Sequence, residues 1–526
     1  MRSLWRTTVG GVLTVVVVGA LLLAPGPAHA AITNQRISGA DRYATAVAVS
    51  KAAFPDPAEA SAVVVASGET FADALSGGPV AAALGGPLLL TGAGALPAIV
   101  AAEISRLRPA RVMILGGEAA VSAAVEASLR RLVPDTVRLA GANRFATSIS
   151  ALRATFPEGA NRIYVATGYA FPDALSGGAL AAAEGAPLLI VPGSRGAAAP
   201  EVLELLADWS VSDITVLGGE GAVTAGMAAS LAESTRAVSR IAGADRYAVA
   251  GQIAARFPRA QGEVLLASGR NYPDALTATV LAARRGAPLL LTRPVCTEQT
   301  LRSYAASRPN LVITTVGGIR AVRGYATSFQ PCQSTTDPRS SWVLVNKRNP
   351  LRPVSYAPSD LRRVSISGGY SMRAEAAAAL ERMSAAARAA GVGSLGLTSG
   401  YRSHATQTVV YGNHVRARGQ AGADLVSARP GHSEHQTGLA GDVVACNPNC
   451  GSIDAFGSSA AGRWVAANSH RFGFITRYEA GRTSWTGYAP EPWHLRYVGA
   501  GLAQDYRASG LRSFEEYLGV PAAPRY

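Results

Sequence analysis

The chain has 526 residues, of which 49 are Lys or Arg and 35 are Asp or Glu, giving a formal net charge of +14. This length allows several domains of about 100–200 residues each. A basic chain can bind nucleic acid, a membrane surface or an acidic polymer, and the N-terminal residues exclude the first of these by indicating export.

Residues 1–30 have the pattern of a secretory signal peptide. Arg2 and Arg6 form a basic start, residues 9–23 are nearly all apolar, and residues 28–30 (Ala-His-Ala) place small residues at the cleavage positions. The alternative is an uncleaved anchor helix, but the apolar run is shorter than the about 20 residues of a typical span. No later stretch is long and apolar enough to cross a bilayer, so we expect an exported protein without a stable membrane span after cleavage.

The positive charge of an exported chain needs a partner other than nucleic acid. Anionic polymers in the wall of a Gram-positive envelope carry the complementary charge. We therefore expect the cell wall or cell surface as the location. The alternative is that the charge reflects only an arginine-rich composition.

The middle of the chain contains a threefold repeat. The pattern of residues 36–44, Arg-Ile-Ser-Gly-Ala-Asp-Arg-Tyr-Ala, returns with small changes at residues 138–146 and 240–248, so both steps are 102 residues long. Each copy also carries an Asp-Ala-Leu station, a Pro-Leu-Leu run and a Gly-Gly pair in the same order. A unit of about 100 residues can hold its own core, unlike the shorter repeats of a solenoid.

The first copy shows the local structure that we expect in all three. Asp41 can cap a helix that Pro55 ends. Helices are expected over residues 44–54, 71–84, 99–107 and 120–132, and short apolar strands over residues 62–66, 87–91 and 112–115. Apolar strands that alternate with helices indicate a parallel sheet covered on both faces. Each unit is therefore expected to be a small α/β sandwich.

Two kinds of charged residue recur with the repeat. They could bind a ligand, or they could pair within each unit and fix its loops; these residues are Asp73, Asp173, Asp274, Arg42, Arg144 and Arg246. The glycines at the strand ends lack the G-x-G-x-x-G or Walker pattern of a nucleotide site, and close packing of helix on strand explains them better.

Over about residues 36–326 the repeats resemble cell-wall-binding repeat type 2, found on exported proteins of Gram-positive bacteria. The resemblance implies three Rossmann-like units packed as an intramolecular trimer, and non-covalent attachment to an anionic wall polymer. We place the units at residues 31–133, 134–235 and 236–329. The third copy departs late, because Gly317-Gly318-Ile319 lacks the acidic residue of the other copies, so its last helix is expected to be short.

The chain has four cysteines, an even number in an oxidising compartment. They form two local groups, Cys296 with Cys332 and Cys446 with Cys450, and we predict these two disulfides. The first would tie down the short end of the third unit. The alternative for Cys446 and Cys450 is metal ligation.

Residues 330–341 are rich in Gln, Ser, Thr and Pro and predict an exposed, semi-flexible linker. A helix is expected over residues 372–390, followed by a strand over residues 395–397. This places Arg402 just after a strand end, where its guanidinium can hold a carboxylate through two parallel hydrogen bonds. The alternative is an arginine in a structural ion pair.

Metal-ligating residue types gather near the C-terminal end. Six of the seven histidines lie after residue 400. His435, Asp442 and His494 would supply the three N and O ligands that a catalytic zinc uses, and Glu491, three residues before His494, can take a proton from water. The alternative is a group of solvated or core histidines.

This pattern resembles the zinc site of the VanY/VanX group of D-alanyl-D-alanine peptidases, with Ser399-Gly400-Tyr401-Arg402-Ser403 as a second matching segment. The resemblance runs over about residues 341–518 and implies an α+β zinc peptidase domain, which we place at residues 342–520. It implies Zn²⁺ held by His435, Asp442 and His494, and Glu491 as the general base. It also implies that the substrate's terminal carboxylate is bound by Arg402, Gln407 and Ser433.

The resulting hypothesis is a wall-attached zinc D,D-carboxypeptidase that removes the terminal D-alanine from peptidoglycan stem peptides. Two alternatives stay open. One is another bond specificity, such as an L,D-carboxypeptidase, a dipeptidase or an endopeptidase of the same fold. The other is a wall-binding protein whose peptidase domain only grips peptide.

Overall fold

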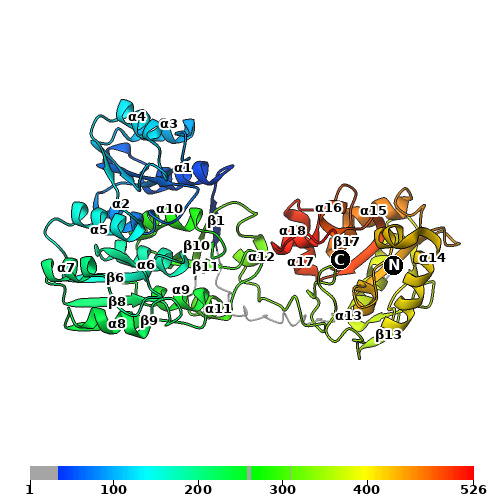
Figure 1. Ribbon diagram of the computed structural model, residues 1–526. Coiled ribbons are helices and arrows are strands. Elements are labelled where there is room, and N and C mark those ends of the chain that lie inside the picture. The colour runs from blue at the N-terminus through cyan, green and yellow to red at the C-terminus, as the bar shows by residue number, and fades with distance from the viewer. Residues whose placement is uncertain (1–32, 258–261, 309) are drawn as a thin grey trace, which may run out of the picture.

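The computed structural model describes residues 33–257, 262–308 and 310–526, so the expected signal peptide at residues 1–30 lies outside the described part. Figure 1 shows two bodies, the repeats in blue to green and the C-terminal domain in yellow to red. Among the helices that are described, none combines the length and the apolar character needed to cross a membrane.

Each repeat unit contains a four-stranded parallel sheet, which confirms the expected α/β class. The first sheet has the order β3 (Leu88–Thr91), β2 (Ala62–Ser67), β4 (Arg111–Leu115) and β5 (Thr136–Leu139). The second has the order β7 (Leu188–Val191), β6 (Arg162–Thr167), β8 (Asp213–Leu217) and β9 (Ala237–Ile241). The third has the order β11 (Leu289–Thr292), β10 (Glu263–Ser268), β12 (Val312–Val316) and β1 (Thr33–Ile37).

The sheets are out of step with the sequence repeat by one strand. β5 and β9 follow the expected starts of the second and third units, yet each completes the sheet of the preceding unit. β1 pairs in parallel with β12, so the first described strand completes the third unit. The edge strands contain several exposed or partly buried residues instead of forming a buried apolar run, which is why the strand pattern predicted only three strands per unit.

A short polar side chain caps the first helix of the sequence repeat in each of its three copies. Asp41 accepts a hydrogen bond from the backbone N–H of Ala44, as expected, and Asn143 and Asp245 cap the equivalent helices. The repeat helices are α1 (Arg42–Ala53), α2 (Gly77–Ala83), α3 (Ala98–Leu107), α4 (Ala123–Leu132), α5 (Arg144–Thr155), α6 (Pro172–Ala183), α7 (Pro200–Asp208), α8 (Ala225–Ala232), α9 (Arg246–Ala254), α10 (Pro273–Arg285), α11 (Gln299–Ala306) and α12 (Gly324–Thr327).

The three units meet around a common centre, which confirms the intramolecular trimer. The rings of Phe71, Phe171 and Tyr272 pack against one another with centroid separations of 5.6, 5.6 and 6.0 Å. Helices α2 and α10 approach so closely that a Cβ on Gly78 would lie 2.3 Å from the Cγ2 of Thr279. Only glycine fits at that position.

The recurring charged residues lie at the junctions between units. Arg144 and Arg246 donate to the carbonyls of Gly168 and Gly269 in their own units, both at 2.7 Å. Each guanidinium also lies 5.7 Å from the centre of an aromatic ring of the preceding unit. Burial raises the pKa of Asp274 to about 6, although Arg42 acts in the opposite direction. These contacts favour the structural interpretation of the recurring Asp and Arg residues.

The C-terminal domain has an α+β fold around an antiparallel sheet. The strand order is β15 (Ser394–Ser399), β16 (Ala440–Cys446), β18 (Glu491–Tyr497) and β17 (Phe474–Tyr478). A hairpin of β13 (Leu361–Arg363) and β14 (Ser371–Arg373) precedes α13 (Ala374–Ala389), which begins two residues later than the expected helix. The other helices are α14 (His404–Val426), α15 (Ala460–Asn468), α16 (Thr483–Thr486), α17 (Ala500–Ala508) and α18 (Phe514–Leu518).

The four cysteines form the pairs Cys296–Cys332 and Cys446–Cys450. The first pair lies beside the last helix of the third unit, α12, which has 4 residues where α4 has 10. The expected shortening of this helix is therefore present.

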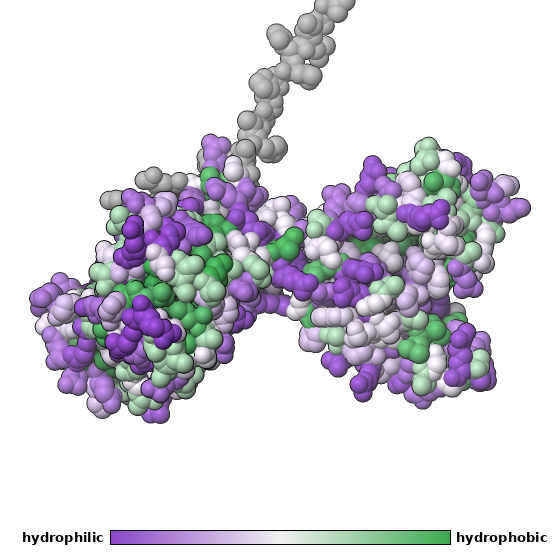
Figure 2. All heavy atoms as spheres, turned by 90° about the horizontal axis from the view of Figure 1, so that it is seen from above, coloured by the Kyte–Doolittle hydropathy of each residue, from purple (hydrophilic) through white to green (hydrophobic). Residues whose placement is uncertain are grey.

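A buried cluster joins the two bodies on either side of the connection, residues 330–341, which its composition predicts to be exposed and semi-flexible. Figure 2 shows the two bodies meeting at a region narrower than either of them. Across it, Val295 and Cys296 of the third unit and Trp342, Tyr506 and Tyr517 of the C-terminal domain belong to one buried cluster, which we call the shared cluster. Composition could not show this, because the buried side chains lie outside residues 330–341.

Candidate metal and substrate site

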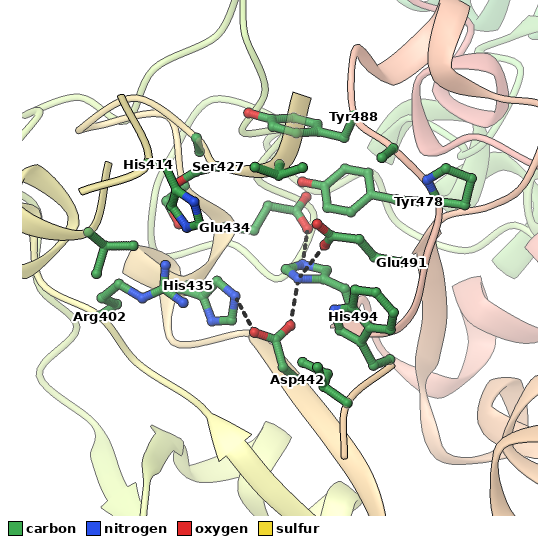
Figure 3. A pocket seen from close by; sticks show the side chains of 18 of the residues that line it. Arg402, His414, Ser427, Glu434, His435, Asp442, Tyr478, Tyr488, Glu491 and His494 are labelled. Atoms are coloured by element: carbon green, nitrogen blue, oxygen red, sulfur yellow. Dashed lines mark hydrogen bonds and ion pairs between the residues drawn. The ribbon is translucent and has the colours of Figure 1, made fainter. Parts of the chain in front are cut away.

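Three of the predicted residues converge in one cleft of the C-terminal domain (Figure 3). Asp442 on β16 and His494 on β18 are direct partners in the antiparallel register, so their side chains share a face of the sheet. His435 comes from the short 3₁₀ helix η2 (Glu434–Thr437). One ligand atom from each of the three residues lies within 4.8 Å of the others, and all three residues are buried.

The hydrogen bonds around His435 determine which ring nitrogen is free. Its Nδ1 lies 2.9 Å from the carbonyl oxygen of Gly400 and therefore donates its hydrogen there. Nε2 then lies 3.3 Å from Oδ2 of Asp442 with an available electron pair. On the other side, Nδ1 of His494 lies 3.0 Å from Oδ1 of Asp442. Two nitrogens and one carboxylate thus point to a common position.

The electrostatics of this group suit a bound cation. Burial alone would lower the pKa of His494, but hydrogen bonds to Asp442 and Glu434 outweigh it and raise the pKa to about 9. Burial likewise opposes ionisation of Asp442, yet the two imidazoles lower its pKa below the usual range. The carboxylates therefore stabilise positive charge here, which a metal ion can supply in place of a proton. Two histidines and one aspartate match the donor set of a catalytic zinc site.

Glu491 faces the same cleft because β18 is irregular. Residues three apart on a regular strand point to opposite faces, which would separate Glu491 from His494. The register of β17 with β18 shifts between Thr476 and Tyr478, and the irregularity turns both side chains inward, as bulges beside active sites do. Oε2 of Glu491 lies 3.7 Å from Nδ1 of His494. Burial raises the pKa of Glu491 to about 7, so its carboxyl can accept and return a proton near neutral pH.

Arg402 lies on the opposite side of the cleft from Glu491 (Figure 3). It follows β15, as predicted, and its guanidinium donates to Oγ of Ser399 at 2.8 Å and to Oε1 of Gln407 at 2.9 Å. Gln407 is fully buried and donates to the carbonyl of Ala428 at 2.6 Å. Gln407 therefore lies behind Arg402 and holds it, whereas Arg402 and Ser433 line the cleft.

The cleft has a volume of about 470 Å³. Its walls include the aromatic residues Tyr488 and Trp493, and also His414 and Arg418 from α14. His414 is thus part of the cleft. Helix α14 is interrupted at Gly419, whose backbone angles of φ 69° and ψ 168° are not helical.

Glu434 is the residue that the sequence did not single out. Its Oε2 lies 3.4 Å from Nε2 of His494, and its Oε1 accepts from Arg477 at 2.9 Å and Arg496 at 2.8 Å. The available signal was an arginine in each of two neighbouring strands of the sheet, Arg477 in β17 and Arg496 in β18. A buried arginine requires a buried acid, and Glu434 directly precedes the predicted ligand His435.

Comparison with known proteins places both parts of the chain. Residues 369–500 match the family VanY, D-alanyl-D-alanine carboxypeptidase. Residues 36–126, 138–228 and 240–324 each match Cell wall binding domain 2. Three wall-binding repeats followed by this domain define a wall-associated carboxypeptidase. The chain belongs to the VanY D-alanyl-D-alanine carboxypeptidase family and carries three cell wall binding domain 2 repeats.

Individual relatives agree with this assignment. The chain is 40% identical over 193 residues to a Bacillus subtilis protein named "Putative carboxypeptidase YodJ", covering 35% of this chain and 70% of that one. It is 37% identical over 187 residues to a D-alanyl-D-alanine carboxypeptidase of Enterococcus faecalis, covering 34% and 65%. The structure of Cwp6 from Clostridium difficile shares the fold, with a TM-score of 0.52, 23% identity, and coverage of 67% of this chain and 57% of that one. The chain thus spans just over half of Cwp6 and about two thirds of the two peptidases.

Proposed function

We propose that this protein is an exported, wall-attached zinc D,D-carboxypeptidase that removes the terminal D-alanine from peptidoglycan stem peptides. The observation that carries the proposal is a single cleft in which a two-histidine, one-carboxylate group, a second carboxylate and a guanidinium face one another. The relative from Enterococcus faecalis, named a D-alanyl-D-alanine carboxypeptidase, supports the choice of bond.

His435, Asp442 and His494 would hold the zinc ion. When bound there, zinc supplies a Lewis acid that polarises the scissile carbonyl and makes a water molecule more acidic. The support from this chain is that the three donor atoms converge, are buried and are surrounded by groups that favour positive charge.

The side chains around this group perform the remaining steps of the proposed mechanism. Arg402 and Ser433 receive the free carboxylate of the last residue, which makes the enzyme a carboxypeptidase, and Gln407 keeps Arg402 in place. Glu491 takes the proton from the attacking water and returns it to the leaving amine. Burial keeps the pKa of Glu491 close to neutrality, so both transfers are accessible.

The repeats are proposed to hold the enzyme on the wall. The match to cell wall binding domain 2 and the net charge of +14 support attachment to an anionic wall polymer. The proposed organisation is a signal peptide (1–30), three repeats (31–133, 134–235 and 236–329), a connection (330–341) and a peptidase domain (342–520).

A mass-spectrometric assay tests the proposal. The purified protein without residues 1–30 is incubated with synthetic stem pentapeptide ending in D-Ala-D-Ala and with the corresponding tetrapeptide, and its metal content is measured on the same sample. Loss of one alanine from the pentapeptide, abolished by a chelator and restored by zinc, is the expected result. Cleavage of the tetrapeptide alone would identify an L,D-carboxypeptidase instead. Absence of both zinc and cleavage would leave wall binding as the function.

A further inference from the structure

Two buried polar atoms beside the metal site face each other. They are Nε2 of His494 and Oε2 of Glu434, which lie 3.4 Å apart. Within the described residues, neither atom has another hydrogen-bond partner. Both residues are almost fully buried, at 3% and 2% exposure. A buried polar group left unpaired destabilises the folded state, so a hydrogen on Nε2 shared with the carboxylate is the arrangement that satisfies both atoms.

We propose that Glu434 is a positioning residue that holds His494 in the tautomer with its hydrogen on Nε2. Nδ1 of His494, 3.0 Å from Oδ1 of Asp442, then carries the electron pair that faces the metal position. The inference rests on the zinc site of the proposed function. A carboxylate behind a metal-ligating histidine orients the ring and makes the ligand more basic.

Glu434 is itself held rigidly, which is what a positioning role requires. Its other oxygen, Oε1, accepts from Nε of Arg477 and Nη1 of Arg496, and the three side chains are completely buried. Oε2 is left free to face His494. The ring of Tyr478 packs on the imidazole of His494 with a centroid separation of 4.9 Å and limits its rotation. Glu434 thus acts at Nε2 of His494, and Nδ1 is the nitrogen that faces Asp442.

The same network contains a matched control. Arg477 also donates to Oε1 of Glu515 at 2.6 Å and to its Oε2 at 3.0 Å. Glu515 lies on α18 and accepts from Asn346 at 3.0 Å. Glu515→Gln therefore removes a buried carboxylate from Arg477, as Glu434→Gln does, but leaves the carboxylate facing His494 in place.

Zinc affinity is the first test. The full chain without residues 1–30 is compared with E434Q and E515Q, and the zinc dissociation constant of each is measured by competition with a fluorescent chelator. E434Q should bind zinc 10–100 times more weakly than the wild type. The zinc dissociation constant of E515Q should stay within about threefold of the wild-type value, because Glu515 does not face a proposed zinc ligand. Equal losses in the two variants, or no loss in E434Q, would overturn the inference while the zinc site stands. A wild-type protein that binds no zinc would overturn the proposed function as well.

Thermal unfolding in excess EDTA reports how well each variant folds without metal. A second measurement uses only the wild-type protein and therefore does not depend on the folding of the variants. In wild-type protein with ¹⁵N-labelled histidine, long-range ¹H–¹⁵N NMR spectra identify the tautomer of His494 in the zinc-loaded state. A hydrogen on Nε2 supports the inference, and a hydrogen on Nδ1 contradicts it.

Discussion

At the scale of single residues, the spacing of Glu491 and His494 does not by itself bring both side chains into the cleft. Three residues separate them, which in a regular strand would direct them to opposite faces. The register shift opposite Tyr478 brings both into the cleft. The geometry of a proposed base and a proposed ligand therefore depends on one irregularity of β18.

Replacing the proposed base tests its role. Glu491→Gln removes the proton acceptor and leaves His435, Asp442 and His494 unchanged. We expect kcat to fall by a factor of about 10²–10⁴, with zinc content equal to that of the wild type. Glu479→Gln is the control, because Glu479 pairs with Arg512 on the surface. A rate within threefold of the wild type for Glu491→Gln would refute the assignment.

Arg402 is proposed to recognise the free carboxylate of the substrate. Wild-type enzyme should cleave a peptide acid much faster than the same peptide with an amidated C-terminus, because only the acid can accept two hydrogen bonds from the guanidinium. Arg402→Ala should lower kcat/KM for the acid by about 100-fold, the equivalent of about 2.7 kcal/mol, and leave the slow rate for the amide nearly unchanged. An equal loss for both peptides would mean that Arg402 only maintains the structure of the cleft.

At the scale of elements, the junctions between repeat units contain buried charge. Asp274 at the start of α10 faces Arg42 of the first unit, and burial raises its pKa from 3.8 to about 6. Because the folded state binds this proton more tightly than the unfolded state, the ionised carboxyl destabilises the trimer above pH 6. The penalty disappears as the pH falls toward 4.

Asp274→Asn should therefore stabilise the repeats at pH 7.5 by about 3 kcal/mol, because the pKa is raised from 3.8 to about 6 and each pKa unit corresponds to about 1.4 kcal/mol. At pH 4 the variant and the wild type should unfold at nearly the same temperature, which provides an internal control. Thermal unfolding of both proteins at the two pH values checks the prediction. The prediction would be contradicted if the unfolding temperature of the variant, relative to that of the wild type, were lower at pH 7.5 than at pH 4.

At the scale of the whole molecule, the repeats and the peptidase domain share buried contacts. Arg323 of the third unit is 3% exposed and donates to the carbonyls of Glu516 and Tyr517 on α18, both at 3.3 Å. Its guanidinium also lies 5.6 Å from the ring centre of Tyr517. These contacts add to the shared cluster and explain why the bodies meet in a defined arrangement.

Arg323→Ala should weaken this arrangement by about 2 kcal/mol, because it removes hydrogen bonds from a charged donor. We expect the two bodies to unfold in better separated calorimetric transitions and residues 330–341 to become more sensitive to protease. Arg320→Ala is the matched control, since Arg320 has a side chain that is 78% exposed and pairs with Glu516 at 3.5 Å. An exposed pair of this kind contributes at most about 1 kcal/mol. Equal effects of the two variants would argue against a fixed arrangement.

Local signals in the sequence were sufficient for the repeat architecture and for the metal-binding residue types. Apolar runs and helix caps act over a few residues, so β2, β3 and β4 and the cap at Asp41 were predictable. The grouping of His435, Asp442 and His494 was predictable because their spacing resembles a known zinc-site pattern and their side chains are of metal-ligating types.

Only the tertiary structure decided which distant segments meet. β1 completes the third sheet, Gln407 lies behind Arg402, and Glu434 faces His494. β1 and Glu434 meet partners that lie far away in the chain, and burial makes Gln407 and Glu434 pair with polar neighbours. The sequence alone thus determined the residue types and the class of fold, and the packing of the whole chain determined their partners.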